Sequence, residues 1–133
     1  MKSFHVEIVT PDGLEFDGMV ESLLVRAEDG DVEILAGHTD LIASIGVGRA
    51  RIIVNGEKRF ASVNSGFLSV ENGEARLCAI TFEFADQIDL KRAEAAKEKA
   101  EATIKTASDD MAVRVAKAKL MRAASRIKVA NMK

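Results

Sequence analysis

The C-terminal part of the chain is rich in residues that bind anions. Between Met111 and Lys133 there are seven basic residues and no acidic one: Arg114, Lys117, Lys119, Arg122, Arg126, Lys128 and Lys133. Arg122 and Arg126 are four positions apart, so a helix presents both on one face. Guanidinium groups gathered in one place repel each other unless an anion such as a phosphate chain is present. The pattern predicts an anionic partner.

A hairpin of two helices would add a third arginine to this pair. If the chain reverses near residue 108, Arg92 lies opposite Arg122 and Arg126, and Asp89 lies opposite Ile127. One carboxylate and three guanidinium groups would then meet at the open end of the hairpin. From charge alone, two interpretations stay open. The cluster binds a phosphate chain, or Asp89 and Arg126 form an ordinary ion pair on a solvated helix.

The sequence lacks the motifs of catalytic and metal sites. It has neither a glycine-rich loop that cradles a phosphate for transfer nor the Gly-x-Ser-x-Gly elbow of a serine nucleophile. Cys78, His5 and His38 are the only cysteine and histidines, too few for a zinc site. His38 has no evident partner that would make it a general base, so we expect a surface recognition residue there. We expect a protein that is not itself an enzyme.

Composition divides the chain into two parts. The net charge is −2 over 133 residues, but residues 1–85 carry net −7 and residues 86–133 net +5. All nine glycines, the single proline and all six phenylalanines lie in the first part. No apolar run is long enough to cross a bilayer, and the first residues do not read as a secretory leader. We expect one domain over residues 1–85 and a helical unit over residues 86–133.

Residues 1–85 are expected to form short strands separated by turns. Asn55-Gly56 and Asn72-Gly73 each separate two apolar runs, a pattern typical of type I′ β-hairpins. Further turn signals lie at Pro11-Asp12-Gly13, Gly18, Glu28-Asp29-Gly30 and Gly46. This rhythm is typical of a β-sandwich. The predicted fold class is α+β, an N-terminal antiparallel β-sandwich followed by a C-terminal antiparallel two-helix hairpin.

The two expected helices are poor in large side chains. Asp86 is placed to cap the first helix, which runs to about Lys105, and Ser108 is placed to cap the second. Alanines recur at helical spacing along both, and an alanine seam buries little apolar area. We therefore expect a marginally stable hairpin that can move. Few aromatic or leucine side chains are available for membrane insertion, and no Trp or Tyr for stacking on nucleic acid, so we expect neither partner.

Three segments resemble the signature segments of the bacterial F-type ATP synthase epsilon subunit family, in the same order and across the whole chain. They are Gly30–His38, Val63–Val70 and Ile88–Ala93. The family usually has proline at the position of Ala36 and commonly a second glycine at the position of Ser65. Both departures fall at loop or turn positions, so they bear on local rigidity.

The resemblance implies a non-catalytic central-stalk subunit, peripheral on the cytoplasmic face of the bacterial cell membrane. In that family the sandwich binds the gamma subunit and the c-ring and helps to couple proton or sodium flow to rotation. Asp31 and His38 fall at positions that approach the c-ring. The hairpin can instead extend toward the alpha and beta subunits and block ATP hydrolysis. The basic residues that would meet beta are Arg114, Lys117, Lys119, Arg122 and Arg126.

In some members of the family the folded hairpin binds ATP as a regulatory ligand that the subunit does not hydrolyse. The positions that match this site are Ile88, Asp89, Arg92, Ala93, Arg122 and Arg126, with Glu83 and Lys99 as further candidates. Asp89 is anionic, so we expect it to hold an arginine or to cap the helix. The sequence does not show whether Mg²⁺ accompanies the nucleotide.

Two alternatives remain open. The first is a purely structural coupling subunit, whose hairpin stays folded and neither binds nucleotide nor inhibits. The second is a free-standing basic-helix module that recognises an acidic helix outside any ATPase.

Overall fold

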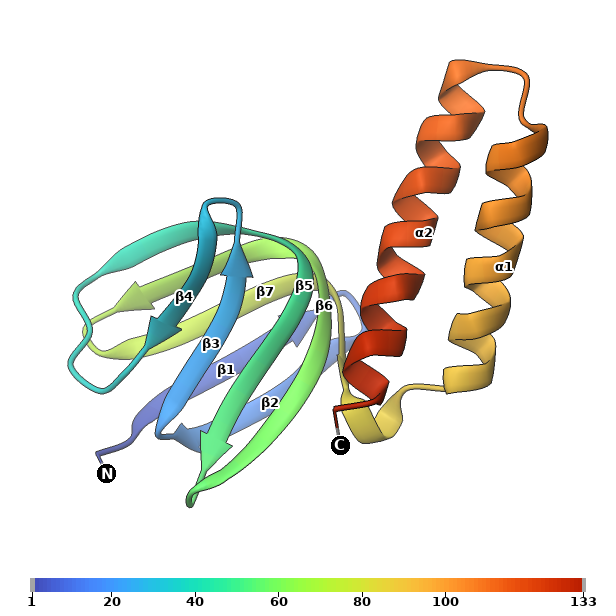
Figure 1. The fold of residues 1–133 in the computed structure, drawn as a ribbon. Helices are drawn as coiled ribbons and strands as arrows, with labels where there is room; N and C mark the ends of the chain where they lie inside the picture. The colour runs from blue at the N-terminus through green and yellow to red at the C-terminus, as the bar shows by residue number, and fades with distance from the viewer. Residues whose placement is uncertain (1, 133) are drawn as a thin grey trace.

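The computed structural model describes residues 2–132, in which seven strands precede two helices (Figure 1). The strands are β1 (Phe4–Thr10), β2 (Gly13–Val20), β3 (Ser22–Ala27), β4 (Gly30–Ile34), β5 (Leu41–Val54), β6 (Glu57–Glu71) and β7 (Glu74–Phe84). A short 3₁₀ helix, η1 (Ala85–Gln87), leads into α1 (Leu90–Thr106), and α2 (Asp110–Ala130) follows. The predicted order of a β domain and then a helical hairpin is confirmed. Lys133 lies outside the described residues.

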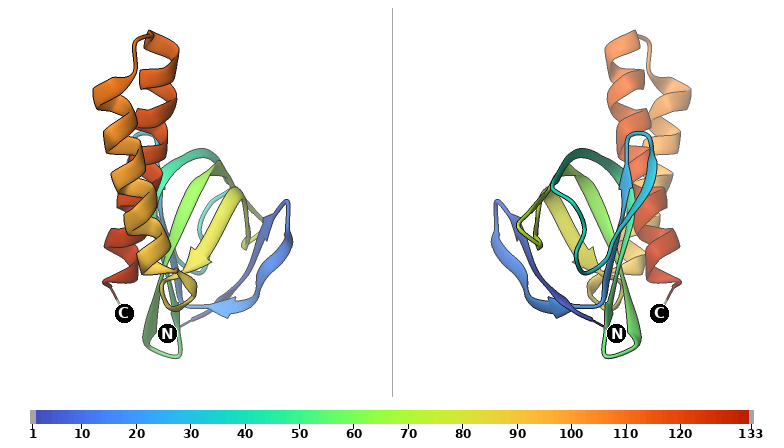
Figure 2. Two further views of the ribbon diagram at one scale, coloured as in Figure 1. Left: turned by 90° about the vertical axis from the view of Figure 1, so that its right-hand side faces the viewer. Right: turned by 90° about the vertical axis from the view of Figure 1, so that its left-hand side faces the viewer.

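The strands form one hydrogen-bonded sheet that folds over on itself, in the order β2-β1-β7-β6-β5-β3-β4 (Figures 1 and 2). The bend lies in the two longest strands. Their ladder pairs Ile45 with Gly66 and next Gly48 with Val63, so the register is kept but the two residues between on each strand are unpaired in this ladder. Because both strands bend there, the two halves of the sheet face each other across a core. The predicted β-sandwich is confirmed, and one adjacent pair of its strands, β1 with β7, is parallel.

Aliphatic side chains fill the core of the sandwich. The largest that are fully buried include Ile8, Leu23, Ile52, Leu68 and Leu77. Each contributes about 1.5–3 kcal/mol of transfer free energy. The sandwich therefore has a large apolar core of its own, which stabilises the strands on which the helices pack.

The two predicted type I′ turns are confirmed, and two other predicted turns are wrong. Asn55 and Gly56 have φ of 51° and 80°, and the second Asn-Gly pair has φ of 52° and 80°. Gly18 lies inside β2, where a Cβ atom would be 3.3 Å from Cζ of Phe16, so this glycine makes room for a phenyl ring. Gly46 lies inside β5, at the bend between the two halves of the sheet.

The helices pack antiparallel through small side chains. Ala93, Ala100, Ala116 and Ala123 are buried in the described structure, whereas Ala96 is exposed. Such a seam brings the helices close together but buries little area, which agrees with the expected marginal hairpin. Neither of the described helices is long and apolar enough to cross a membrane.

The expected capping role of Asp89 is confirmed, whereas the expected caps Asp86 and Ser108 are wrong. Asp89 Oδ1 accepts the Arg92 backbone N–H at 3.1 Å, and Asp109 Oδ1 accepts the Ala112 backbone N–H at 2.7 Å. Asp86 lies inside the 3₁₀ helix η1, so α1 begins about one turn after the position that an Asp86 cap predicts. Ser108 lies one residue before the true cap of α2, whose carboxylate also interacts favourably with the helix dipole.

Candidate functional site

The hairpin docks on the sandwich through a small apolar cluster near η1. Ala85, Ile88, Val129 and Ala130 are buried there, with Phe60 partly buried beside them. This cluster is separate from the core of the sandwich. Figure 2 shows the hairpin standing against one side of the sheet. Because only four buried residues make up the cluster, the docked position is held far less strongly than the strands are held together.

Within residues 2–132, one ion pair supplements this cluster. Arg126 on α2 donates from Nε to Glu83 Oε1 at 2.8 Å and from Nη2 to Oε2 at 3.2 Å. The side chains are 24% and 34% exposed, so the pair is partly shielded from water. The predicted ion pair of Asp89 with Arg126 is wrong, because Asp89 caps α1 and Arg126 faces the end of β7 instead.

A groove of about 810 Å³ lies between the hairpin and the sandwich. Its walls come from α1, α2 and strands β5 to β7, and six charged residues line it: Glu83, Lys99, Asp109, Lys119, Arg122 and Arg126. Four are basic and two acidic, which makes the lining net positive by two. Neutral polar side chains complete it: Ser62, Asn64, Thr81 and Thr103. The volume falls in the usual range for small-molecule sites.

The groove brings together some of the residues predicted for ATP and leaves others out. Glu83, Lys99, Arg122 and Arg126 line it, while four predicted residues do not: Ile88, Asp89, Arg92 and Ala93. Ile88 and Ala93 are buried in the docking cluster and the helix seam. Arg92 is exposed and lies one helical turn before Ala96, which does line the groove. Arg92 is therefore close along α1 to a lining residue but does not itself line the groove.

Sequence reasoning missed the part of the groove that the sandwich supplies. Ser62 and Asn64 come from β6 and Thr81 from β7, and the ladder pairs Asn64 with Thr81. No local pattern signals which face of these strands a distant helix will cover. Thr103 could have been predicted as a lining residue, because it lies one helical turn after the predicted residue Lys99.

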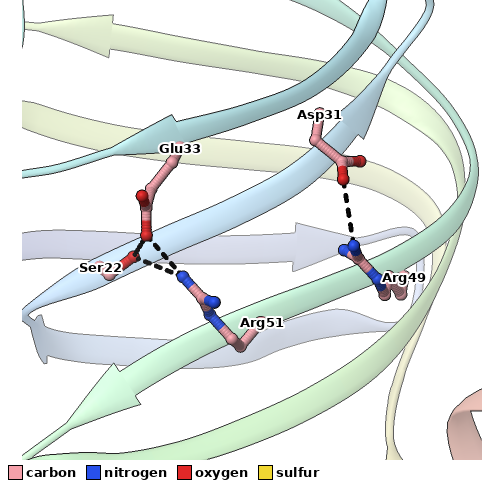
Figure 3. Close-up of polar contacts among 5 residues, drawn as sticks. All are labelled: Ser22, Asp31, Glu33, Arg49 and Arg51. Carbon is pink, nitrogen blue, oxygen red and sulfur yellow. Dashed lines mark hydrogen bonds and ion pairs between the residues drawn. The ribbon is translucent and has the colours of Figure 1, made fainter.

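Of the seven residues predicted to approach the c-ring or beta, four lie away from the groove and three line it. Asp31 on β4 accepts from Arg49 Nη2 at 3.1 Å (Figure 3). Asp31 also lies 3.6 Å from Arg26 Nη1. His38 follows a turn made possible by Gly37 at φ 82°, and its Nδ1 lies 2.7 Å from the Thr39 carbonyl oxygen. Arg114 and Lys117 are exposed on α2 and do not line the groove, whereas Lys119, Arg122 and Arg126 do.

A second polar cluster on the same three strands joins Ser22, Glu33 and Arg51 (Figure 3). Ser22 Oγ donates to Glu33 Oε2 at 2.6 Å, and Arg51 Nη2 donates to the same oxygen at 2.5 Å. The hydrogen bond from Ser22, with the charge of Arg51, lowers the pKa of Glu33 below its ordinary value. This cluster fixes β3, β4 and β5 relative to one another.

Known proteins resemble the chain over nearly its whole length. Residues 3–85 match the family model described as the ATP synthase delta/epsilon chain beta-sandwich domain, and residues 86–131 match the long alpha-helix domain of the same chain. The ATP synthase epsilon chain of Bacillus velezensis is 42% identical, over 98% of this chain and 99% of that one. The epsilon chain of Bacillus cytotoxicus is 35% identical over the full length of both.

Solved structures share the fold at much lower identity. A chain in the mitochondrial ATP synthase of Euglena gracilis superposes with a TM-score of 0.83 at 18% identity, covering 98% of this chain and 82% of that one. A chain in the central stalk and c-ring structure of the Tetrahymena thermophila enzyme gives 0.66 at 14% identity, covering 97% of each. These two structures show the shared fold. The two family models and the full-length bacterial relatives place this chain in the ATP synthase delta/epsilon chain family, among its bacterial F-type epsilon subunits.

Proposed function

We propose that this subunit is a non-catalytic part of the central stalk and that its docked hairpin binds ATP as a regulatory ligand. The observation that carries the nucleotide proposal is the net positive groove between the hairpin and the sandwich, lined by Lys99, Lys119, Arg122 and Arg126. A polyphosphate neutralises such a lining, and guanidinium groups bind phosphate oxygens in pairs.

The Glu83 carboxylate prepares Arg126 for this role. It accepts two N–H bonds and leaves the other N–H donors of the guanidinium free for a phosphate oxygen. Ser62, Asn64 and Thr81 offer hydroxyl and amide groups to the ribose and the base from the strand side. Arg92, one helical turn before the lining residue Ala96, binds the end of the phosphate chain.

ATP then acts as a population switch. A ligand that binds only the docked state stabilises it by about 1.4 kcal/mol at roughly tenfold saturation. That amount matters for a hairpin held by four buried residues and one ion pair. At low ATP the hairpin extends, and its basic face meets the beta subunit. Because Arg122 and Arg126 serve in both states, nucleotide binding and inhibition exclude each other.

The sandwich supplies the fixed contacts of the stalk. Asp31 and His38 approach the c-ring, and the sandwich as a whole binds gamma on the cytoplasmic face of the membrane. An outward-facing set of apolar side chains supports a protein partner, since Ile42, Phe67 and Ile80 are 80%, 49% and 57% exposed. In the ladders Phe67 pairs with Ser44 on β5 and with Cys78 on β7. Ile42 is two residues from Ser44, and Ile80 is two residues from Cys78. Side chains two residues apart in a strand point to the same face, so Ile42, Phe67 and Ile80 share one face.

Calorimetric titration of the isolated chain tests the nucleotide proposal. We expect saturable binding of ATP, tighter than that of ADP, and at least tenfold weaker binding for Arg126→Gln and Arg122→Gln. Lys105→Gln removes one positive charge at the far end of α1 and should leave the affinity unchanged. No binding of wild-type protein at millimolar ATP, or equal affinity in all variants, would refute the site.

The Glu83–Arg126 pair also supports the alternative of a permanently docked coupling subunit, because it holds the hairpin without any ligand. The two functions differ in the assembled enzyme. If the hairpin inhibits, truncation after residue 87 raises the rate of ATP hydrolysis, most strongly at low ATP. An unchanged rate would favour the coupling subunit.

A further inference from the structure

We call the groove of about 810 Å³ that we propose for ATP the nucleotide groove. A second groove, of about 390 Å³, lies on the other side of α2. Its residues come from β3 to β5 and from the last turns of α2: Arg26, Asp31, Val47, Gly48, Arg49, Met121, Ser125, Lys128 and Val129. Val47 is the one residue that both grooves share within the described part of the chain. We call this second groove the Lys128 groove.

Positive charge is in excess in the Lys128 groove. Arg26, Arg49 and Lys128 face one carboxylate, that of Asp31, so the lining is net positive by two. Asp31 is already engaged by both arginines, at 3.1 Å from Arg49 and 3.6 Å from Arg26. Among residues 2–132, Lys128 has no acidic partner within ion-pair distance. The positive charges of Arg26 and Arg49 on the sandwich and of Lys128 on α2 are therefore only partly balanced by the Asp31 carboxylate.

The backbone and the arginines are arranged around this space. A Cβ atom on Gly48 would lie 2.9 Å from Cβ and 3.1 Å from Cγ of Arg26, so glycine lets the stem of Arg26 cross β5 toward the groove. Arg49 Nη1 is buried and has no hydrogen-bond partner in the described structure. A buried donor without an acceptor is costly. Arg49 lines the groove, and its side chain is 35% exposed.

We propose that the Lys128 groove binds a phosphate oxyanion, which joins Arg26 and Arg49 of the sandwich to Lys128 and Ser125 of α2. A dianionic phosphate neutralises the excess of two positive charges, and it accepts the hydrogen bonds that Asp31 leaves unfilled. The Ser125 hydroxyl donates one more. With a water molecule taking about 30 Å³, the space holds a tetrahedral oxyanion and several waters.

This site is distinct from the nucleotide groove and does not depend on it. An anion in the Lys128 groove binds both the strands and the helix, so it also favours the docked hairpin. Free inorganic phosphate and a phosphoryl group of a larger molecule share this chemistry. The surface position and the water around it predict weak binding, in the millimolar range.

The test is an NMR titration of the full ¹⁵N-labelled chain with sodium phosphate, with sodium chloride adjusted to hold ionic strength constant. We expect saturable shifts of the Gly48, Arg49, Ser125 and Lys128 amides. Lys128→Gln should weaken the apparent affinity tenfold or more. Arg122→Gln, which alters only the nucleotide groove, and Lys105→Gln, which alters neither, should leave it unchanged.

Two results would overturn the proposal. One is shifts that stay linear and equal those in chloride alone. The other is saturable binding that Arg122→Gln abolishes and Lys128→Gln does not, which would assign the phosphate to the nucleotide groove. A parallel titration with ADP separates the sources. If ADP moves the Ser125 and Lys128 amides and inorganic phosphate does not, the bound oxyanion is the phosphoryl group of a larger molecule.

Discussion

The Arg126 guanidinium of α2 donates two hydrogen bonds, at 2.8 and 3.2 Å, to the Glu83 carboxylate at the end of β7. The two residues are 43 positions apart, and they join the helical hairpin to the sandwich. Both line the groove that we assign to ATP. The Glu83–Arg126 pair, which holds the hairpin on the sandwich, therefore lies inside the proposed ATP site.

Removing either partner of this pair should loosen the docked hairpin. We expect Glu83→Gln and Arg126→Gln each to destabilise the helices by about 0.5–1.5 kcal/mol, since the pair is bidentate but partly solvated. A double-mutant cycle, followed by the helical circular dichroism signal in urea, measures the coupling. Glu101→Gln on the exposed face of α1 is the control. A coupling energy of zero would show that the pair does not contribute to docking.

The alanine seam should not tolerate a larger side chain. Ala123 is 3% exposed between the helices, and leucine there forces them apart, at a cost of about 1–3 kcal/mol. Ala118→Leu, on the exposed side of α2, makes the same change without steric conflict. Thermal melts of the helical signal compare the two. Equal melting temperatures would mean that the helices are not in close contact in solution.

Gly66 in β6 cannot carry a side chain without moving its neighbour β7. A Cβ atom there would lie 1.9 Å from the Cys78 carbonyl oxygen and 2.8 Å from Ala79 Cα. We expect Gly66→Ala to destabilise the sandwich by at least about 2 kcal/mol in chemical denaturation. Gly46→Ala is the matched control, because its Cβ meets nothing within 4 Å. Similar losses in both variants would contradict the steric argument.

The stability of the sandwich should depend on pH through His5. The hydrogen bond to Asp17, helped by the nearby Glu74 carboxylate, raises the pKa of His5 above its ordinary value. A raised pKa means that this contribution to stability is complete below the ordinary value and is lost as pH rises through the raised one. Compared with His5→Gln, the wild-type chain should be more stable at pH 5, and the difference should vanish by about pH 9. A difference that grows with pH would contradict this assignment.

Local signals were sufficient to predict much of the fold. The Asn-Gly pairs require positive φ, and both turns formed where expected. The helix spacing of the alanines predicted the seam, although Ala96 proved to be exposed. Ser65, which stands where the family commonly has glycine, has φ of 45° in the bend of β6, and this explains why glycine suits that position.

Contacts between distant segments could not be predicted from local patterns. Nothing in β1 indicates that it pairs in parallel with β7 rather than antiparallel with another strand. The prediction that Arg92 lies opposite Arg122 and Arg126 assumes an ideal hairpin and takes no account of the sandwich. The end of β7 presents Glu83 to α2, so Arg126 pairs with it and Asp89 is left to cap α1. The sandwich wall of the groove depends on the same long-range packing.

Hydrogen exchange of the α2 amides, measured in the isolated chain with and without saturating ATP, is the most direct test of ATP-stabilised docking. We predict that ATP slows exchange along α2 by about tenfold at tenfold saturation and leaves the sandwich core unchanged. Arg126→Gln should abolish the effect, and Lys105→Gln should keep it. Exchange rates in α2 that stay the same with and without ATP would contradict a nucleotide-sensitive hairpin.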